Sequence, residues 1–399
     1  MTEPIGINVG GGRIVKNVVV FPYGQEFRPA MEYSQFIGPE YEIKALVSPK
    51  GWRLCGQEVP YKKGDVENRC LTVQPSLSEA LSDETDTVLI PSFRSSMYDQ
   101  SYERKVIDSI AGSIGHFRDV ICCKQFTDGN MGLLRETCAQ AGCGFDDKAT
   151  PRGVDQLPFY SAKLEKYDDN FSSLVKIDAP IIAVAGMGED INKTEVALAL
   201  RDMLASEGYR VSMVGSKNYC EVLEANPFPS FMFLPQIDER LKVVFFNMYV
   251  KHIEDTEKPD IIVISIPGAT KAYSSEITQG FGLLHHEVFQ AVLADYLVMC
   301  SYYLTDAADY LRRESETCRH RFGCGIDSCH ISGTYVEYND TREQRRIVTS
   351  AAPKGGVSQT IAKNDMGGGP ILFDVFDESG RRKLHGDVMK KLNPDFVLV

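Results

Sequence analysis

The sequence lacks the apolar segments that would place a protein in or across a membrane. No run of apolar residues approaches the roughly 18 that a transmembrane helix needs. The first residues, MTEPIGINVGGGRIVKN, have neither the basic flank nor the apolar stretch of a signal peptide. These two absences predict a cytoplasmic protein with no membrane partner.

The sequence also has few basic residues relative to acidic ones, and its cysteines show no regular spacing. Lysine and arginine number 43 against 55 aspartate and glutamate residues, which gives a net charge of -12. Nucleic acids are bound through clustered positive charge that releases counterions, so we expect no nucleic-acid partner. The 11 cysteines are odd in number and scattered, which favours free thiols over a disulfide framework.

The chain shows no internal repeat or low-complexity tract, and its 399 residues suffice for two or three domains. The first third alternates β-rich runs with helical periods, as a parallel sheet with crossover helices does. A segment rich in Pro, Tyr and Asp then resembles an interdomain connection. We therefore expect a Rossmann-like α/β domain over 1–150, a linker over 151–178 and a P-loop NTPase-like parallel-sheet domain over 179–399. The strands expected in the first domain are Asn17–Phe21, Glu42–Val47, Thr87–Ile90 and Asp119–Cys122.

The second domain begins with an uninterrupted apolar run, 180–186, that suits a strand buried on both faces. Segments with apolar residues at helical spacing separate the later β-rich runs, so this domain is expected to be α/β as well. Its further strands are expected at Arg210–Val214, Asp260–Ile266, Tyr296–Cys300, His330–Val336, Ile371–Val375 and Phe396–Val399.

One passage of the second domain has the pattern of a phosphate-binding loop. A buried strand ends at Gly186, a loop with Gly188 follows, and Asn192, Lys193 and Thr194 open a helix. Glycines let backbone amides converge on phosphate oxygens, and the helix N-terminus adds unpaired N–H donors. Lysine supplies a positive charge and threonine can hold Mg²⁺. The pattern predicts ATP or GTP, with Mg²⁺, at these five residues.

The passage departs from G-x-x-x-x-G-K-[ST] at several positions. Met187 stands where the first glycine belongs, and Asn192 replaces the glycine before the lysine. Asparagine tolerates left-handed backbone better than most residues, so the turn can survive. Glu189 and Asp190 would repel a triphosphate unless they point outward or hold the metal. We expect weakened affinity, with both carboxylates as candidate Mg²⁺ ligands beside Thr194.

A later segment, 259–268, matches part of the metal-sensing switch of P-loop GTPases. In the pattern D-x-x-G, Ser265 occupies the aspartate position and Gly268 the glycine position. A hydroxyl lacks the charge that favours an oxygen cage around Mg²⁺, which puts hydrolysis in doubt. Both residues are candidate nucleotide contacts, and a core strand ended by a Pro-Gly turn explains them nearly as well.

Over roughly 180–300 the chain resembles the SIMIBI branch of P-loop NTPases, which includes metal-insertion GTPases and dethiobiotin-synthetase-like ligases. The whole chain, with IGINVGGGR, INKTEVALALRD and GGGPILFDVFDE, is similar to the clostridial peptide-maturation system proteins, which are encoded beside radical SAM enzymes. The resemblance implies an accessory role in handling a precursor peptide, with a radical SAM enzyme as a further partner. It does not identify a reaction.

Three cysteines and a histidine crowd one short segment near residue 320. Thiolates and imidazoles bind zinc or iron–sulfur clusters, although the first gap here is wider than in common zinc sites and ferredoxin spacings are absent. The alternative is a loop of reduced cysteines before a strand. The candidate ligands are Cys318, Cys324, Cys329 and His330.

Two adjacent histidines, His285 and His286, fall in an expected helix. Adjacent helical side chains point about 100° apart, so the two imidazoles cannot act together. One of them can face the crevice at the strand ends, and a solvated histidine is the favoured interpretation.

These patterns leave three functions open. The first is a nucleotide-binding accessory protein for maturation of a ribosomally made peptide or a cofactor, acting in natural product biosynthesis, with P-loop NTPase or ATP-dependent ligase-like activity undecided. The second is a non-catalytic, degenerate P-loop scaffold that binds a precursor peptide or a partner enzyme. The third is a metal carrier built on the cysteines. No catalytic residue and no oligomeric state are assigned.

Overall fold

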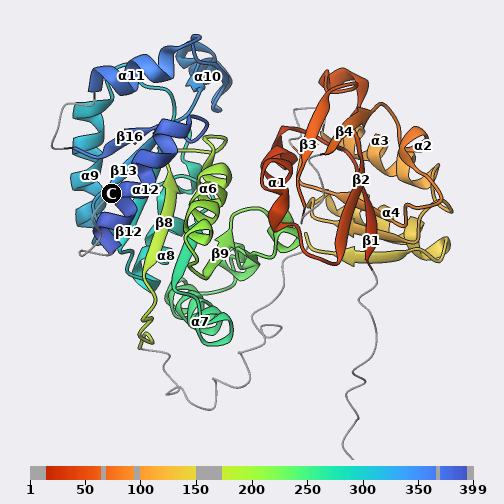
Figure 1. Ribbon diagram of the computed structural model, residues 1–399, viewed down its shortest axis with the longest axis horizontal. Coiled ribbons are helices and arrows are strands. Elements are labelled where there is room, and N and C mark those ends of the chain that lie inside the picture. Colours follow the sequence, from red (N-terminus) through yellow and green to blue (C-terminus); the bar gives the residue numbers. More distant parts are fainter. Residues whose placement is uncertain (1–14, 64–68, 94–98, 150–172, 365–368, 393–399) are drawn as a thin grey trace, which may run out of the picture. The chain divides into compact units, whose positions relative to one another are not determined.

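The chain folds into two α/β units. The computed structural model describes residues 15–63, 69–93, 99–149, 173–364 and 369–392. One unit comprises 1–150 with Glu221–Glu224, and the other comprises 151–220 with 225–399. Each unit is built on a seven-stranded sheet that is parallel or nearly so, which confirms the predicted α/β class (Figure 1).

The first unit has a sheet in which all neighbouring strands are parallel except β3 and β4. Apolar residues of α3 and α4 pack on one face of this sheet, as their helical spacing predicts. The four predicted strands are present, and each of the three that were not predicted contains polar residues. In sheet order the strands are β3 (Glu58–Tyr61), β4 (Arg69–Gln74), β2 (Tyr41–Val47), β1 (Lys16–Val20), β5 (Thr87–Ile90), β6 (Asp119–Cys122) and β7 (Gly144–Asp147). The helices are α1 (Arg28–Glu32), α2 (Leu77–Ala80), α3 (Asp99–Ala111) and α4 (Asp128–Gln140).

The second unit has a fully parallel sheet with β8 near its centre. All six residues of β8 are buried, as expected for an apolar strand covered on both faces. In sheet order the strands are β10 (Asn226–Pro227), β9 (Val211–Gly215), β11 (Ile261–Ser265), β8 (Ile181–Gly186), β12 (Tyr296–Ser301), β13 (Ser328–Ile331) and β16 (Ile371–Phe373). A separate hairpin pairs β14 (Thr334–Val336) with β15 (Thr349–Ala351).

Helices cover both faces of this second sheet. Helices α6 (Lys193–Ser206) and α12 (Glu378–Leu392) lie together on one face, and α7 (Glu239–Glu257), α8 (Leu283–Ala291) and α9 (Ala307–Phe322) lie on the other (Figure 1). The shorter α10 (Tyr338–Gln344) connects β14 to β15, and α11 (Gly356–Asn364) follows β15. This layering leaves the carboxyl ends of the strands as one edge where the following loops meet.

One strand expected in the second unit is corrected by the structure, and another cannot be compared with it. The single strand expected over 330–336 is broken into β13 and β14, because residues 332–333 leave the parallel sheet and the chain then enters the hairpin. The strand expected over 396–399 lies outside the described residues.

The described end of the predicted linker is tied to the second unit. The N–H of Val175 donates to Asn247 Oδ1 at 2.7 Å, and Asn247 Nδ2 donates to the Val175 carbonyl at 3.0 Å. Asn247 lies on α7, so residues around 175 pack along that helix.

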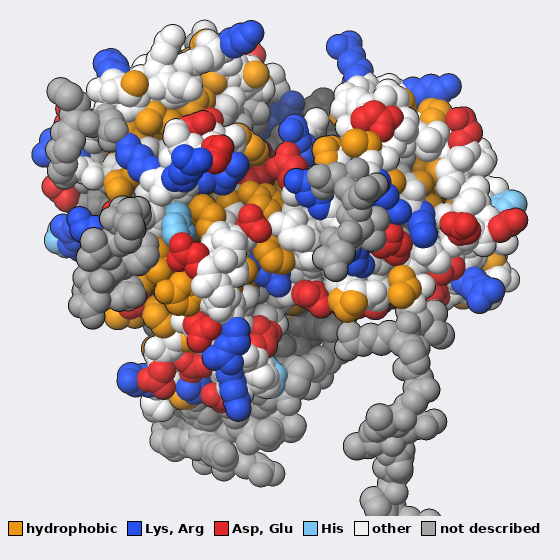
Figure 2. Space-filling view, in the orientation of Figure 1, with side chains coloured by type: hydrophobic (Ala, Val, Ile, Leu, Met, Phe, Trp, Pro, Cys, Tyr) orange, Lys and Arg blue, Asp and Glu red, His pale blue; other side chains and the backbone are white. Residues whose placement is uncertain are grey.

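Charged side chains of both signs are interspersed on the face of the molecule in Figure 2, where neither sign forms a continuous field. Among the helices of the described ranges, none is both long enough and apolar enough to span a membrane.

Candidate functional site

The phosphate-loop candidate lies where the strand order of the second sheet reverses. The chain passes from β8 to β9 and β11 on one side and then to β12 and β13 on the other. Such a switch point opens a crevice at the carboxyl ends of the strands, where ligands bind in open α/β sheets. The residues that meet here lie at or just beyond the carboxyl ends of five different strands: Gly186–Thr194 at β8, Ser216 after β9, Gly268 after β11, Tyr302 after β12 and Ser332 after β13.

The loop backbone is left-handed at two non-glycine residues, Asp190 (φ 58°) and Asn192 (φ 66°). Asn192 has this conformation as the residue immediately before α6, as expected from its replacement of a glycine. Its Oδ1 accepts a hydrogen bond from Ser332 Oγ at 2.7 Å, and its Nδ2 donates to Glu195 Oε1 at 3.1 Å. These bonds hold the turn that leads into Lys193.

His330 supports the same turn. Its Nδ1 accepts a hydrogen bond from the Val375 N–H at 3.2 Å, so Nε2 carries the hydrogen and donates to Asn192 Oδ1 at 3.3 Å. Burial lowers the pKa of His330 to about 3, which keeps the ring neutral. The imidazole is therefore a support for the loop.

Lys193 is buried at the first position of α6, with 5% of its side chain exposed. Its Nζ donates to the Gly188 carbonyl at 2.9 Å and to the Gly268 carbonyl, and lies 3.7 Å from Glu189 Oε2. Burial lowers the pKa of Lys193, and the Glu189 carboxylate opposes that shift. The ammonium group thus joins the loop to the turn after β11.

The Glu189 carboxylate also contacts that turn. Its Oε1 accepts a hydrogen bond from the Gly268 N–H at 2.7 Å, and Gly268 has a φ of +82°. Glu189 therefore lies between a lysine ammonium and a backbone N–H, which are the donors that an anion requires. The contacts described for this carboxylate are to a cation and a hydrogen-bond donor, and its predicted role as a Mg²⁺ ligand stays a prediction.

Of the three predicted Mg²⁺ ligands, Thr194 lies next to other hydroxyl groups. Thr194 Oγ1 lies 3.4 Å from Ser216 Oγ, which accepts a hydrogen bond from Ser265 Oγ at 3.2 Å. Across the described residues, no group of three or more His, Cys, Asp or Glu side chains is arranged to hold a metal ion. The structure thus places Thr194 and Ser265 together through Ser216. The prediction that Glu189 and Asp190 join Thr194 as Mg²⁺ ligands stays a prediction.

Backbone donors remain at the start of α6. Within the described part of the chain, the amides of Gly188, Lys193 and Thr194 donate no hydrogen bond to a protein acceptor. The N-terminus of a helix as long as α6 also carries a partial positive charge. The loop therefore offers unpaired N–H groups beside a lysine, as a phosphate site requires.

The loop glycines are required by close packing. A Cβ at Gly188 would lie 2.0 Å from the Tyr302 hydroxyl, and a Cβ at Gly186 would lie 2.8 Å from Lys193 Cδ. The Tyr302 hydroxyl donates to the Glu189 carbonyl at 3.3 Å, so the same tyrosine also positions the loop backbone. The sequence predicted these glycines from phosphate binding alone.

Several residues around the loop escaped the sequence analysis. Ser216, Tyr302, Ser332 and Thr334 each contact the loop or its first helical residues, and Thr334 Oγ1 donates to the Asp190 carbonyl at 3.0 Å. All four follow the carboxyl end of a strand closely. That position in each βα connection is the signal by which they can be found.

The four predicted metal ligands near residue 320 do not come together as a metal site. Cys318 lies on α9 and Cys329 on β13, and both are buried in the hydrophobic core. His330 follows Cys329 and points instead to Asn192. Burial raises the pKa of Cys318 and Cys329 to about 12 and that of Cys324 to about 11, so the thiols are protonated at neutral pH. Of the expected loop of cysteines, only Cys324 lies outside a helix or strand, because Cys318 belongs to α9 and Cys329 to β13.

No protein-family model matches the sequence, and no curated protein matches it. Among solved structures, a DUF1611 family protein from Anabaena variabilis matches 94% of this chain and 99% of its own, with a TM-score of 0.56 and 13% identity. The likeness is one of fold. It supports the two-domain α/β architecture over almost the whole length, and at this identity it carries no activity across.

Other solved structures are too distant to support an argument. ATP citrate lyase from Methanosaeta concilii matches 97% of this chain and 52% of its own at 8% identity, with a TM-score of 0.28. A pseudomurein peptide ligase type C from Methanothermus fervidus matches 61% of this chain and 38% of its own at 11% identity, with a TM-score of 0.20.

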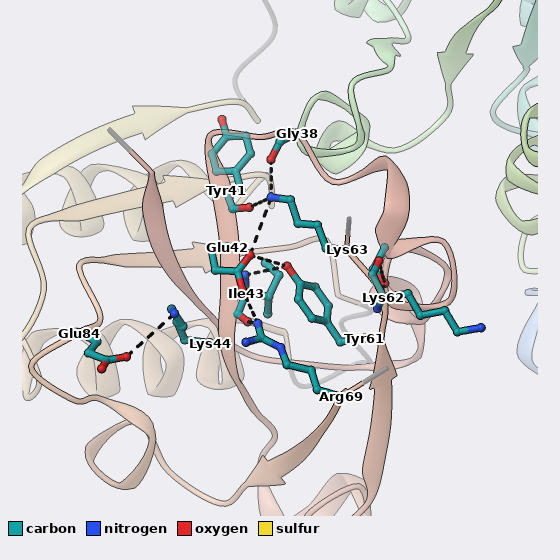
Figure 3. A network of polar contacts seen from close by, with 11 residues as sticks. Gly38, Tyr41, Glu42, Ile43, Lys44, Tyr61, Lys62, Lys63, Arg69 and Glu84 are labelled. Carbon is teal, nitrogen blue, oxygen red and sulfur yellow. Dashed lines mark hydrogen bonds and ion pairs between the residues drawn. The ribbon is translucent and has the colours of Figure 1, made fainter. Parts of the chain in front are cut away.

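The first unit holds a polar network on β2, β3 and β4 (Figure 3). The Glu42 carboxylate accepts hydrogen bonds from the Tyr61 hydroxyl at 3.2 Å and from Arg69 at 2.5 Å, and lies 4.0 Å from Lys63 Nζ. Arg69 also donates to the Ile43 carbonyl at 2.7 Å. Because Tyr61 of β3 and Arg69 of β4 both contact β2, the network joins the antiparallel β3–β4 pair to the parallel strands.

A cavity of about 430 Å³ also lies in this unit, lined by residues of α1 and β3 among others. No sequence motif in the lining indicates a ligand. The phosphate loop of the second unit therefore remains the candidate functional site.

Proposed function

We propose that the second unit binds a nucleotide, ATP or GTP, with Mg²⁺ at the loop Gly186–Thr194. The observation that supports this proposal is an anion already held there. The Glu189 carboxylate accepts from the Gly268 N–H and faces the Lys193 ammonium, next to amides that have no protein acceptor. A site that holds a carboxylate in this way has the donors for a phosphate.

The residues present fit a nucleotide phosphate chain and one Mg²⁺ ion. Lys193 and the amides of Gly188, Lys193 and Thr194 would hold phosphate oxygens. The Thr194 hydroxyl, next to Ser216 and Ser265, would contact Mg²⁺. Mg²⁺ keeps several water ligands and takes others from phosphates, so one hydroxyl is a sufficient protein ligand, and the ion would neutralise phosphate charge.

The same residues favour binding over rapid hydrolysis. Ser265 places a hydroxyl where a carboxylate would stabilise the metal, and no side chain near the loop is assigned as a base for water. The proposed role is that of a cytoplasmic, nucleotide-binding accessory protein in maturation of a ribosomally made peptide or a cofactor. The part of this role that names a precursor peptide and a radical SAM enzyme rests on the resemblance to clostridial peptide-maturation proteins.

The carboxylate between Lys193 and Gly268 also favours a second candidate. If Glu189 keeps these donors permanently, the domain is a degenerate P-loop scaffold that binds a precursor peptide or a partner enzyme without nucleotide. Titration calorimetry separates the two, because the scaffold binds neither ATP nor GTP at millimolar concentration.

Replacing Lys193 with alanine is expected to weaken nucleotide binding about 100-fold, which is the effect of losing charged hydrogen bonds of about 1.5–3 kcal/mol. Titration calorimetry with ATP and GTP, with and without Mg²⁺, measures the change. Lys390→Ala is the matched control, because Lys390 is exposed in the last turn of α12. Equal affinities of wild type and Lys193→Ala would contradict the assignment of Lys193.

A further inference from the structure

The position of the Glu189 carboxylate has a consequence for which nucleotide the loop accepts. In a phosphate loop the amides hold the inner phosphates, and the lysine reaches the outer ones. Here the carboxylate lies 3.7 Å from the Lys193 ammonium and takes the Gly268 N–H at 2.7 Å. It therefore lies where the outermost phosphate of a triphosphate would be.

The inner part of the loop, unlike the donors at Lys193 and Gly268, is not engaged by Glu189. The amides of Gly188, Lys193 and Thr194 have no protein acceptor in the described ranges. Glu189 engages the outer donors, so its carboxylate and a terminal phosphate would compete for the same two groups. The Glu189 carboxylate and a terminal phosphate are both negative, so they would repel each other at these donors. The burial of Lys193 strengthens the electrostatic interactions of its ammonium group.

We propose that Glu189 serves as a built-in terminal anion and makes the loop select nucleoside diphosphates over nucleoside triphosphates. This inference rests on the proposed nucleotide site and refines its ligand: ATP and GTP still bind there, but ADP and GDP bind more tightly. A diphosphate uses the inner amides while Glu189 stays on Lys193 and Gly268. A triphosphate has to displace the carboxylate from both donors, and 55% of the Glu189 side chain is exposed.

The loop is built to keep this carboxylate in place. The backbone of Glu189 is held through its carbonyl by the Tyr302 hydroxyl at 3.3 Å. The carbonyl of Asp190 accepts a hydrogen bond from Thr334 Oγ1 at 3.0 Å, and Asp190 itself is left-handed. Two neighbouring peptide groups are thus held by Tyr302, just after β12, and by Thr334 of β14, and they direct the Glu189 side chain toward the turn at Gly268.

The experiment compares wild type with Glu189→Gln as full-length chains. Titration calorimetry with ADP, ATP, GDP and GTP in Mg²⁺ gives the ratio of triphosphate to diphosphate dissociation constants. Glutamine keeps the shape and one acceptor oxygen but removes the charge. We expect the wild type to prefer the diphosphate, and Glu189→Gln to lower the ratio about tenfold, as loss of one partly screened like charge near a phosphate does.

Glu207→Gln is the matched control. Glu207 follows the last residue of α6, at the opposite end of that helix from Lys193, roughly 20 Å away by helical rise. It removes the same net charge and is expected to leave the ratio unchanged. A wild type that binds triphosphates more tightly, or a ratio that Glu189→Gln leaves unchanged, overturns the inference while nucleotide binding itself stands. If neither wild type nor Glu189→Gln binds any of the four nucleotides, the proposed function falls and the inference falls with it.

Discussion

Replacing Gly282 with alanine is expected to destabilise the second unit by about 3 kcal/mol or more, since a backbone clash adds to backbone strain. Gly282 has a φ of +71°, and a Cβ there would lie 2.0 Å from the Thr270 carbonyl oxygen. Thr270 is itself fixed, because its N–H donates to the Gly186 carbonyl at 2.9 Å and its carbonyl accepts from Arg321 at 3.1 Å. Displacing Thr270 therefore disturbs the strand end where the phosphate loop begins, and nucleotide binding is expected to weaken as well.

Gly280→Ala is the matched control for this variant. Gly280 has a similar φ of +66°, but a Cβ there meets nothing within 4 Å. Its cost is that of left-handed backbone alone, about 1–2 kcal/mol. Urea unfolding followed by circular dichroism compares the two variants with wild type. Equal losses of stability in Gly282→Ala and Gly280→Ala would show that the close approach to Thr270 does not contribute to the loss.

The strand, loop and helix of the candidate site could be predicted because their signals are local. An apolar run, two glycines and the Asn-Lys-Thr sequence at a helix start stand within 14 residues, 181–194, and the structure forms β8, the loop and α6 over that range. Strands β3, β4 and β7 escaped prediction because each contains residues that are depleted or uncommon in buried strands: β3 is EVPY, β4 is RCLTVQ and β7 is GFDD. Continuous apolar runs therefore mark the strands that were predicted, and partly polar sequences mark those that were missed.

The direction of Glu189 could not be predicted from the sequence. The carboxylate meets Gly268 because β11 pairs directly with β8, although β9 comes between them in the chain. Sheet order places residues 79 positions apart in contact, and spacing along the sequence does not determine that order. The same reason explains why Ser216 and Ser332, which follow other strands, were missed.

The two adjacent histidines of α8 show a similar limit. The sequence favoured solvation, and His286 is indeed exposed, but His285 has 0% exposure. A helical period predicts that the two side chains diverge, and the packing of α8 against its neighbours decides which one is buried. Neither ring nitrogen of His285 has a hydrogen-bond partner among the described residues.

Acid is expected to destabilise the second unit through His285 and His330. Burial, together with the nearby charges of Lys193 and Arg321, holds the pKa of His285 well below its usual value, and burial lowers the pKa of His330 to about 3. Both rings are neutral in the folded state, whereas in the unfolded chain they take up protons below about pH 6.5. The unfolded state therefore binds more protons, and stability falls as pH falls through that value. Each histidine is expected to cost about 2 kcal/mol between pH 7 and pH 5, or about 4 kcal/mol together.

His285→Leu isolates one of the two contributions. Leucine has a similar volume and needs no hydrogen bond, so the variant is expected to be at least as stable as wild type at pH 7, because an unpaired buried donor costs about 1–3 kcal/mol. Its loss of stability between pH 7 and pH 5 is expected to be smaller than that of wild type by about 2 kcal/mol. His286→Leu is the control, because that side chain is exposed in the folded protein and in the unfolded chain alike. Urea unfolding at pH 5, 6 and 7 measures all three proteins, and parallel pH profiles for wild type and His285→Leu would mean that His285 becomes protonated without unfolding.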